Sequence, residues 1–319
     1  MSLSALRSDA VDPVAIAAAL RGQVESVVRG KPDSIRLALC ALLAGEHLLV
    51  EDVPGTGKTM LARSLAAALG GSFRRVQCTP DLLPSDLVGT TVFDTARHEW
   101  SFRPGPVFAN VVLVDELNRA SPRTQAALLE PMEEASVSID GVTHALPRPF
   151  LVIATQNPHG SAGTFALPES QLDRFGAALS MGVPDRASQR ALLRGEGGSG
   201  ALDDIVTVCT PPQLAATMTT IESIHLADVV LDYVLDLAEA TRCHGAIVLG
   251  ASPRAIDSLV RLARAHAVVG GRGYVSPDDV QAVFVASLSH RVVTIEGISI
   301  TTASAALREL LDYVVVPTG

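Results

Sequence analysis

The sequence lacks any long apolar run and has no basic start followed by an apolar core at its N-terminus. No stretch approaches the roughly 18 consecutive apolar residues of a membrane-spanning helix. A secretory signal would need the missing N-terminal pattern. We therefore expect neither membrane insertion nor secretion.

Paired cysteines and clusters of basic residues are also missing. The four cysteines (Cys40, Cys78, Cys209 and Cys243) are scattered and form no Cys-x-x-Cys pair. This spacing favours unpaired thiols in a reduced, cytoplasmic protein and disfavours a zinc site. Lysine and arginine form no run, and the net charge is −9. A protein that coats nucleic acid usually has a basic surface, so we expect no nucleic-acid partner.

The pattern of apolar residues divides the 319 residues into an α/β part and a helical part. Between residues 47 and 154, short apolar runs alternate with polar or helical stretches, which is typical of a parallel sheet buried on both faces. Beyond Pro211-Pro212 the pattern is almost wholly helical, with Ser252-Pro253 and Ser276-Pro277 as helix starts. We predict an α/β core with N-terminal helices over residues 1–186, a linker over 187–212 and a helical lid over 213–319.

The most informative motif is a glycine-rich segment between a predicted strand at 47–50 and a predicted helix at 60–69. It matches a phosphate-binding loop, although Asp52 replaces the first glycine of the general pattern. Backbone N–H groups of such a loop, with the helix N-terminus, surround an anion. Lys58 adds a positive charge for the β- and γ-phosphates, and the Thr59 hydroxyl can ligate Mg²⁺. The residues predicted to hold the nucleotide are Val53, Pro54, Gly55, Thr56, Gly57, Lys58, Thr59 and Met60.

Two later strands end in polar residues at the edge where a parallel sheet binds ligands. Asp115 and Glu116 follow the apolar run 111–114, so Asp115 is a candidate metal ligand and Glu116 a candidate base for an attacking water. Asn157 follows the strand at 150–154 and would lie beside the γ-phosphate. Structural alternatives exist for each: the acids could cap the next helix, predicted at 122–134, and an Asn before Pro also forms turns.

Two arginines could stabilise charge that develops on a transferred phosphoryl group, because a guanidinium stays ionised and binds bidentately. Arg174 lies in the segment 167–175, and Arg254 lies at the start of a predicted lid helix. From the chemistry alone, a surface salt bridge is the more common role of an arginine and is the favoured alternative for either residue.

Taken together, these motifs closely resemble the MoxR family of AAA+ ATPases, from about residue 28 to residue 288. The segments that carry the resemblance are Glu51-Asp52, Asp115–Ala120, Thr124–Glu130, Met132–Glu134, Ala154–Pro158, Leu167–Phe175 and Gly250–Arg254. The resemblance implies a AAA+ P-loop parallel sheet core flanked by helices, with a C-terminal all-helical lid and with ATP and Mg²⁺ as cofactors. The implied roles are Walker A for Lys58 and Thr59, Walker B for Asp115 and Glu116, sensor 1 for Asn157, a finger into the neighbouring subunit for Arg174 and sensor 2 for Arg254.

The resemblance also implies assembly and partners. It suggests a homo-hexameric ring, a partner with a von Willebrand A domain and a protein client. Two insertions into the core, at residues 80–108 and 136–146, would face a central pore or partners. Asp140-Gly141, flanked by alternating residues, independently predicts that the second insertion is a hairpin.

The resemblance leaves open what ATP hydrolysis is used for. Remodelling or maturation of a client is one use, and insertion of a metal or cofactor is another, because MoxR proteins resemble the ATPase subunit of magnesium chelatases. A nucleotide-dependent switch or scaffold with little turnover is a further alternative, which intact Asp115, Glu116 and Asn157 disfavour. The acidic composition disfavours a DNA motor.

Overall fold

A five-stranded parallel sheet organises the chain, in the order β2-β5-β8-β1-β9. The computed structural model describes residues 12–53, 55–96, 98–156 and 164–317. The pairing registers align the strand ends, with Gln77 opposite Asp115 and Val50 opposite Thr155, so residues after these strands meet at one edge. The strands are β1 (Leu48–Glu51), β2 (Phe73–Gln77), β5 (Val111–Asp115), β8 (Leu151–Gln156) and β9 (Ala177–Leu179).

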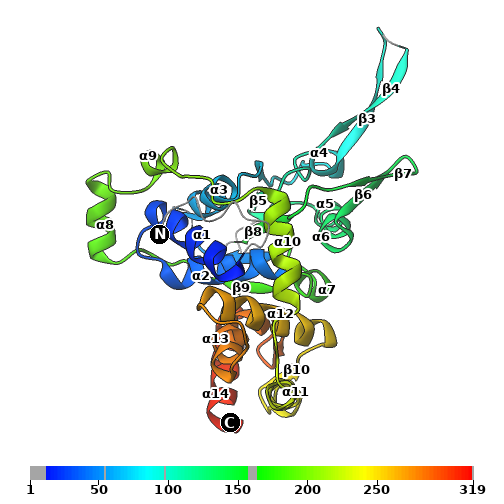
Figure 1. Ribbon diagram of the computed structural model, residues 1–319. Helices are drawn as coiled ribbons and strands as arrows, with labels where there is room; N and C mark the ends of the chain where they lie inside the picture. The colour runs from blue at the N-terminus through cyan, green and yellow to red at the C-terminus, as the bar shows by residue number, and fades with distance from the viewer. Residues whose placement is uncertain (1–11, 54, 97, 157–163, 318–319) are drawn as a thin grey trace.

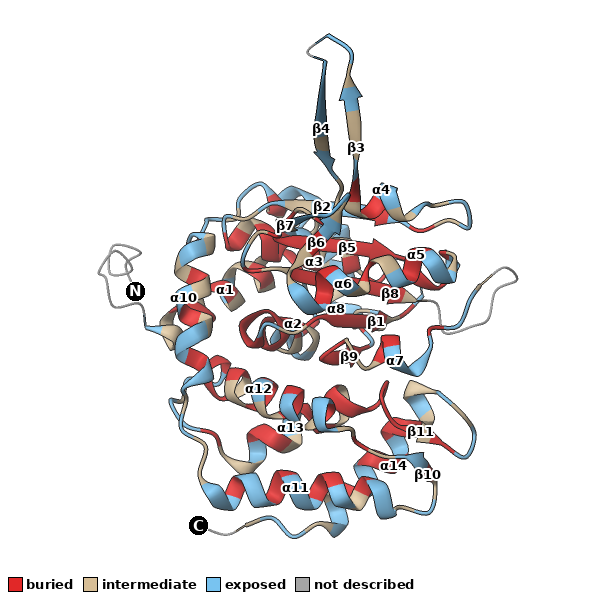
Figure 2. Cartoon of the chain, turned by 90° about the vertical axis from the view of Figure 1, so that its right-hand side faces the viewer, coloured by how far each residue is buried: buried red, intermediate tan, exposed pale blue. Residues whose placement is uncertain are grey.

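The two faces of this sheet pack into separate hydrophobic clusters. Because successive side chains of a strand point to opposite faces, Val111 and Leu113 enter one cluster, and Val112 and Val114 enter the other. The first cluster includes apolar side chains of three helices, α1 (Pro13–Val27), α2 (Pro32–Ala44) and α3 (Lys58–Ala68). Figure 2 shows these buried residues in the central strands and on the inward sides of the helices. Burial on both faces explains the continuous apolar runs of the sequence.

Two antiparallel hairpins project from one side of the core (Figure 1). The longer hairpin pairs β3 (Gly89–Asp94) with β4 (Glu99–Pro104) and follows the short helix α4 (Pro84–Val88). The shorter pairs β6 (Ser136–Ile139) with β7 (Val142–Ala145). Its turn places Asp140 and Gly141 at φ angles of 51° and 79°, which confirms the hairpin predicted from this dipeptide.

The helix predicted over 122–134 is broken in the structure. It forms α5 (Pro122–Ala127) and α6 (Leu129–Glu134), which follow a short 3₁₀ turn, η2 (Leu117–Arg119). Pro131 has no backbone N–H and cannot donate to the carbonyl of Ala127, so a continuous hydrogen-bond ladder is impossible there.

The C-terminal part is helical, as predicted, apart from a small two-stranded ribbon. Its helices are α10 (Pro211–Glu222), α11 (Asp228–Cys243), α12 (Pro253–Val269), α13 (Pro277–Leu288) and α14 (Ile300–Tyr313), and its ribbon pairs β10 (Ile247–Leu249) with β11 (Val293–Thr294). The Ser252 hydroxyl accepts the N–H of Ala255 at 3.1 Å, so the predicted helix start is confirmed. Neither α14 nor the ribbon was predicted.

The lid packs directly on the core. Figure 1 shows α12 and α13 next to the core. Their buried side chains belong to the same hydrophobic cluster as those of α1 and α2. The connecting residues contain α8 (Arg186–Leu193) and α9 (Ser199–Leu202), so the segment predicted as a linker is partly helical. Within the described ranges, no helix is both long and apolar enough to cross a membrane.

Candidate nucleotide-binding site

The phosphate-binding loop connects the end of β1 to the start of α3. Gly55 and Gly57 have φ angles of 87° and 100°, which an L side chain rarely adopts, so both glycines are needed for the shape of the loop. Lys58 begins α3 and is only 9% exposed, and its Nζ donates to the carbonyl oxygen of Asp52 at 3.0 Å. The lysine head therefore lies back along the loop. Pro54 is outside the described residues.

A cavity of about 310 Å³ adjoins the loop at the carboxyl edge of the sheet. The strand ends and the helix start contribute its lining. These residues are Gly55, Gly57, Lys58, Thr59, Met60, Arg75, Gln77, Asp115, Glu116 and Thr155. The structure thus brings together both halves of the predicted site, which are more than 50 residues apart in the sequence.

Asp115 is a buried carboxylate at the end of β5. It accepts from Arg75 Nε at 2.6 Å and from the Thr155 hydroxyl at 3.3 Å. The Arg75 guanidinium shows that this carboxylate attracts a cation on the cavity side. Thr59 lines the same cavity, and one carboxylate with one hydroxyl suits Mg²⁺, which takes its remaining ligands from phosphates and water. These residues fit the predicted metal site.

Glu116 has an unusual backbone for a non-glycine residue, with φ 56° and ψ 48°. Such a conformation costs about 1–3 kcal/mol and persists only where neighbours fix it. Its N–H donates to the Thr155 hydroxyl at 2.9 Å. Its Oε2 accepts from Gln77 Nε2 and from Arg119 Nη1, each at 3.0 Å. The carboxylate is thereby held at the cavity, where a general base or water-orienting group would act.

Three residues of this site were not predicted: Arg75, Gln77 and Thr155. Arg75 and Gln77 lie on β2, two positions apart and so on one face of the strand. The argument from strand ends, which found Asp115, applies equally to Gln77 at the end of β2. Thr155 directly follows the predicted strand 150–154, so the same argument applies to it, although a threonine next to an apolar strand is common and gives a weaker signal. The predicted sensor Asn157 lies outside the described residues.

The two predicted arginines lie together but away from this cavity. Arg174 Nη1 and Arg254 Nη2 both pair with the carboxylate of Glu133, on α6. The three side chains line a second cavity of about 250 Å³. The hydrogen bond from Arg254 lowers the pKa of Glu133 below its ordinary value. Among the described residues, the lining of the phosphate-loop cavity comes from the core, and Arg254, to which the resemblance gives the role of sensor 2, is not part of it.

The contacts around the start of α12 explain this position. The Ser252 hydroxyl contacts the Asp173 carboxylate at 3.2 Å, and Arg291 Nη2 donates to the Asp173 carbonyl at 2.9 Å. The buried His290 donates from Nε2 to the carbonyl oxygen of Phe175 at 2.6 Å. The Ser252 bond holds the start of α12, and the bonds of His290 and Arg291 hold the residues after α13, against the segment that carries Arg174. Arg254 therefore faces the same side of the molecule as Arg174.

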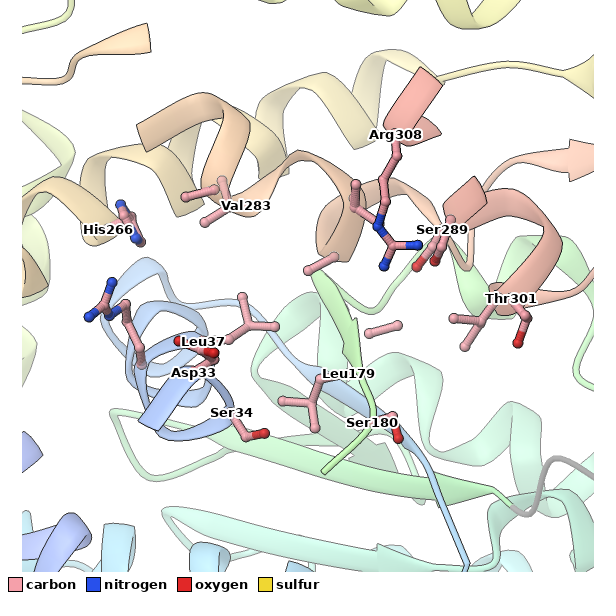
Figure 3. A pocket seen from close by; sticks show the side chains of 17 residues that line it. Asp33, Ser34, Leu37, Leu179, Ser180, His266, Val283, Ser289, Thr301 and Arg308 are labelled. Atoms are coloured by element: carbon pink, nitrogen blue, oxygen red, sulfur yellow. The ribbon is translucent and has the colours of Figure 1, made fainter. Parts of the chain in front are cut away.

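A larger cavity, of about 560 Å³, lies between core and lid (Figure 3). Leu37 on α2 and Leu179 on β9 line it from the core. His266, Val283 and Arg308 line it from the lid. It contains none of the predicted site residues, and its volume alone does not make it a nucleotide site.

Two family models match the chain. The model described as ATPase family associated with various cellular activities (AAA) matches residues 47–177, which hold the phosphate loop and the strand ends. A model of the AAA lid domain matches residues 239–310. The order of core and lid along the chain is therefore the order of these two models.

Curated relatives match most of the chain. The uncharacterised Bacillus subtilis protein YeaC is 42% identical over 299 residues, with 92% of each chain covered. Chaperone MoxR1 of Mycobacterium tuberculosis is 37% identical over 85% of this chain and 74% of its own. Protein MoxR of Paracoccus denitrificans is 34% identical over 86% of both chains. The crystal structure of a proposed ATPase from Cytophaga hutchinsonii superposes with a TM-score of 0.86, at 32% identity, over 96% of this chain and 97% of that one.

Proposed function

Because this chain belongs to the MoxR family of AAA+ ATPases, we propose that it hydrolyses Mg-ATP at a site shared between two subunits and uses the energy to remodel a partner protein. One observation carries the proposal for catalysis: Lys58, Thr59, Asp115 and Glu116 line a single cavity. A phosphate group, a metal ion and an attacking water each have a matching residue there.

Binding of the triphosphate starts from the loop. The N–H groups at the start of α3 and the charge of Lys58 stabilise the β- and γ-phosphates. Lys58 Nζ now donates to the carbonyl of Asp52, so binding replaces a neutral acceptor by an anionic one. Thr59 and Asp115 would hold Mg²⁺, which supplies charge neutralisation at the phosphate oxygens when bound. Arg75 then has to leave the side of Asp115 that faces the cavity.

Hydrolysis requires a water placed in line with the γ-phosphate. Glu116 is the group proposed to orient this water and to accept its proton. Gln77 and Arg119 both donate to one oxygen, Oε2, which leaves Oε1 free of those two donors. Asn157, from the following strand, stays in the proposal as a second contact to the water.

Arg174 and Arg254 are proposed to act together on the nucleotide of a neighbouring subunit. Their shared pairing with Glu133 supports this, because both guanidinium groups converge on one anionic oxygen pair. A γ-phosphate presented by a second copy would offer negative charge at that place. Such a site makes activity depend on assembly, and the family resemblance suggests a hexameric ring.

The output proposed is chaperone-like remodelling of a client protein. The name Chaperone MoxR1, given to a relative, supports it. The hairpin β3–β4 carries Trp100, 71% exposed, against Phe93, with ring centroids 5.2 Å apart, and this aromatic pair is suited to contact a partner. A von Willebrand A domain protein remains the proposed partner. Metal or cofactor insertion into that partner, and a switch with little turnover, are the alternatives.

The substitution Glu116→Gln tests the catalytic proposal. The variant keeps the cavity and loop but cannot accept a proton, so it should bind ATP normally and lose at least about a hundredfold in turnover, as expected for loss of a general base. Phosphate release and equilibrium ATP binding measure the two properties. Turnover near the wild-type rate would show that Glu116 is not the base, and a wild type without turnover would favour the switch.

A further inference from the structure

Asp52, which replaces a glycine of the general phosphate-loop pattern, binds two backbone N–H groups through its side chain. It is 5% exposed and lies between the end of β1 and the loop. Its Oδ2 accepts the N–H of Met181 at 2.6 Å and the N–H of Gly182 at 2.9 Å. A buried carboxylate that receives two backbone N–H groups forms charge-assisted hydrogen bonds, which are stronger than neutral ones. A glycine at position 52 could not make them.

Lys31 binds the other side of the same two residues. It is 8% exposed, and its Nζ donates to the carbonyl oxygens of Met181 and Gly182, the latter at 2.9 Å. Both N–H groups of the turn thus meet a carboxylate, and both carbonyls meet an ammonium. Charges of opposite sign on two separate segments fix the position of this turn, which directly follows β9.

The turn is also in contact with the phosphate loop. A β-carbon at Gly57 would lie 3.7 Å from Met181 Cε, so the methionine methyl packs against the loop. The carbonyl of Asp52 accepts Lys58 Nζ, while its carboxylate holds the turn. Asp52 therefore contacts Lys58 through its main chain and the Met181–Gly182 turn after β9 through its side chain.

We infer that Asp52 is a positioning residue of the nucleotide site, which holds the Met181–Gly182 turn against the phosphate loop and couples phosphate binding to the segment that leads toward the lid. This inference rests on the nucleotide binding of the proposed function. When Lys58 moves from the Asp52 carbonyl to a phosphate, the main chain at Asp52 loses a bond. The carboxylate transmits that change to the turn.

Three variants test this inference with mant-ATP as the probe. Asp52→Gly restores the general loop pattern and removes both bonds to the turn, so mant-ATP affinity should fall about tenfold, as expected for two lost charge-assisted bonds. Asp52→Asn keeps the shape of the side chain and one acceptor oxygen. Its affinity for mant-ATP should lie between that of the wild type and that of Asp52→Gly. Lys31→Met leaves the carbonyls unbound and should also weaken binding. Asp185→Ala is the matched control, because it removes a carboxylate that caps α8 in the same segment, and it should bind mant-ATP normally.

Amide hydrogen exchange separates coupling from a general loss of stability. In the wild type, mant-ATP should change the exchange of the peptide that spans residues 177–184. In Asp52→Asn and Asp52→Gly this peptide should exchange faster, and the nucleotide should no longer change it. The inference is overturned if both variants bind mant-ATP as the wild type does, or if the response to nucleotide persists. A wild type that binds no mant-ATP would overturn the proposed function as well, whereas normal hydrolysis with unaffected Asp52 variants would overturn this inference alone.

Discussion

Glu133 should restrain activity by occupying the two arginines that are proposed to reach a neighbouring subunit. Its carboxylate pairs with Arg174 and with Arg254 in the single chain. If those arginines serve the γ-phosphate of a neighbour, assembly has to break both ion pairs. Substitution Glu133→Gln removes the charge but retains the size of the side chain, so it lowers the cost of releasing the arginines.

The size of this effect follows from the exposure of the three side chains. Glu133 is 37% exposed, Arg174 25% and Arg254 44%. Partly exposed ion pairs of this kind contribute about 0.2–1 kcal/mol each, so two pairs amount to about 1 kcal/mol. Since 1.4 kcal/mol corresponds to a factor of ten, the gain in assembly should be about fivefold.

The assay is ATP hydrolysis measured over a range of protein concentrations. The concentration that gives half-maximal specific activity should fall about fivefold in Glu133→Gln. Glu134→Gln is the matched control, because Glu134 is the adjacent exposed acid on the same helix. An unchanged or higher midpoint in Glu133→Gln would refute the idea that Glu133 competes with the neighbour's phosphate. A higher midpoint would indicate instead that the carboxylate holds the arginines in their active position.

Two further predictions concern buried and polar partners of the core. His47 donates from Nε2 to the Met132 carbonyl and accepts the Val152 N–H at Nδ1, and burial lowers its pKa from 6.5 to about 4. Below pH 6.5 the His47 imidazole binds a proton in the unfolded chain but not in the folded protein, so the free energy of unfolding should fall as the pH drops from 6.5 toward 4. Denaturant titrations at pH 7.5 and pH 5 should show that His47→Asn loses about 2 kcal/mol less unfolding free energy than the wild type does. Gln77→Ala removes one donor to Glu116 and should lower kcat about fivefold with little change in KM, and an unchanged kcat would show that Arg119 alone positions the base.

The phosphate loop and the two acidic strand ends were predictable because their signals are local. A glycine-rich turn needs particular φ angles, and an apolar strand that ends in Asp115 and Glu116 places them at a known edge of a parallel sheet. The five-residue strand β5 is entirely buried, so its sequence pattern was unambiguous. These features follow from a few adjacent residues.

Other features depend on residues that are distant in the sequence. The three-residue strand β9 is too short to give a pattern, and its place beside β1 is fixed by packing. Arg254 lies in the first turn of α12, whose apolar face belongs to the cluster shared with α2, so its position depends on the docking of the whole lid. The task of Asp52 depends on Met181, 129 positions away. Neither composition nor periodicity predicts contacts between residues so far apart in the sequence.

The central claim is that each ATPase site combines residues from two subunits. The direct test mixes two inactive variants, Arg174→Ala, which retains its own phosphate loop, and Lys58→Ala, which retains its own Arg174. Each variant alone should be inactive, and the mixture should recover part of the wild-type ATP turnover, because some interfaces pair an intact loop with an intact arginine. A mixture as inactive as its components, although both variants assemble, would contradict the shared site.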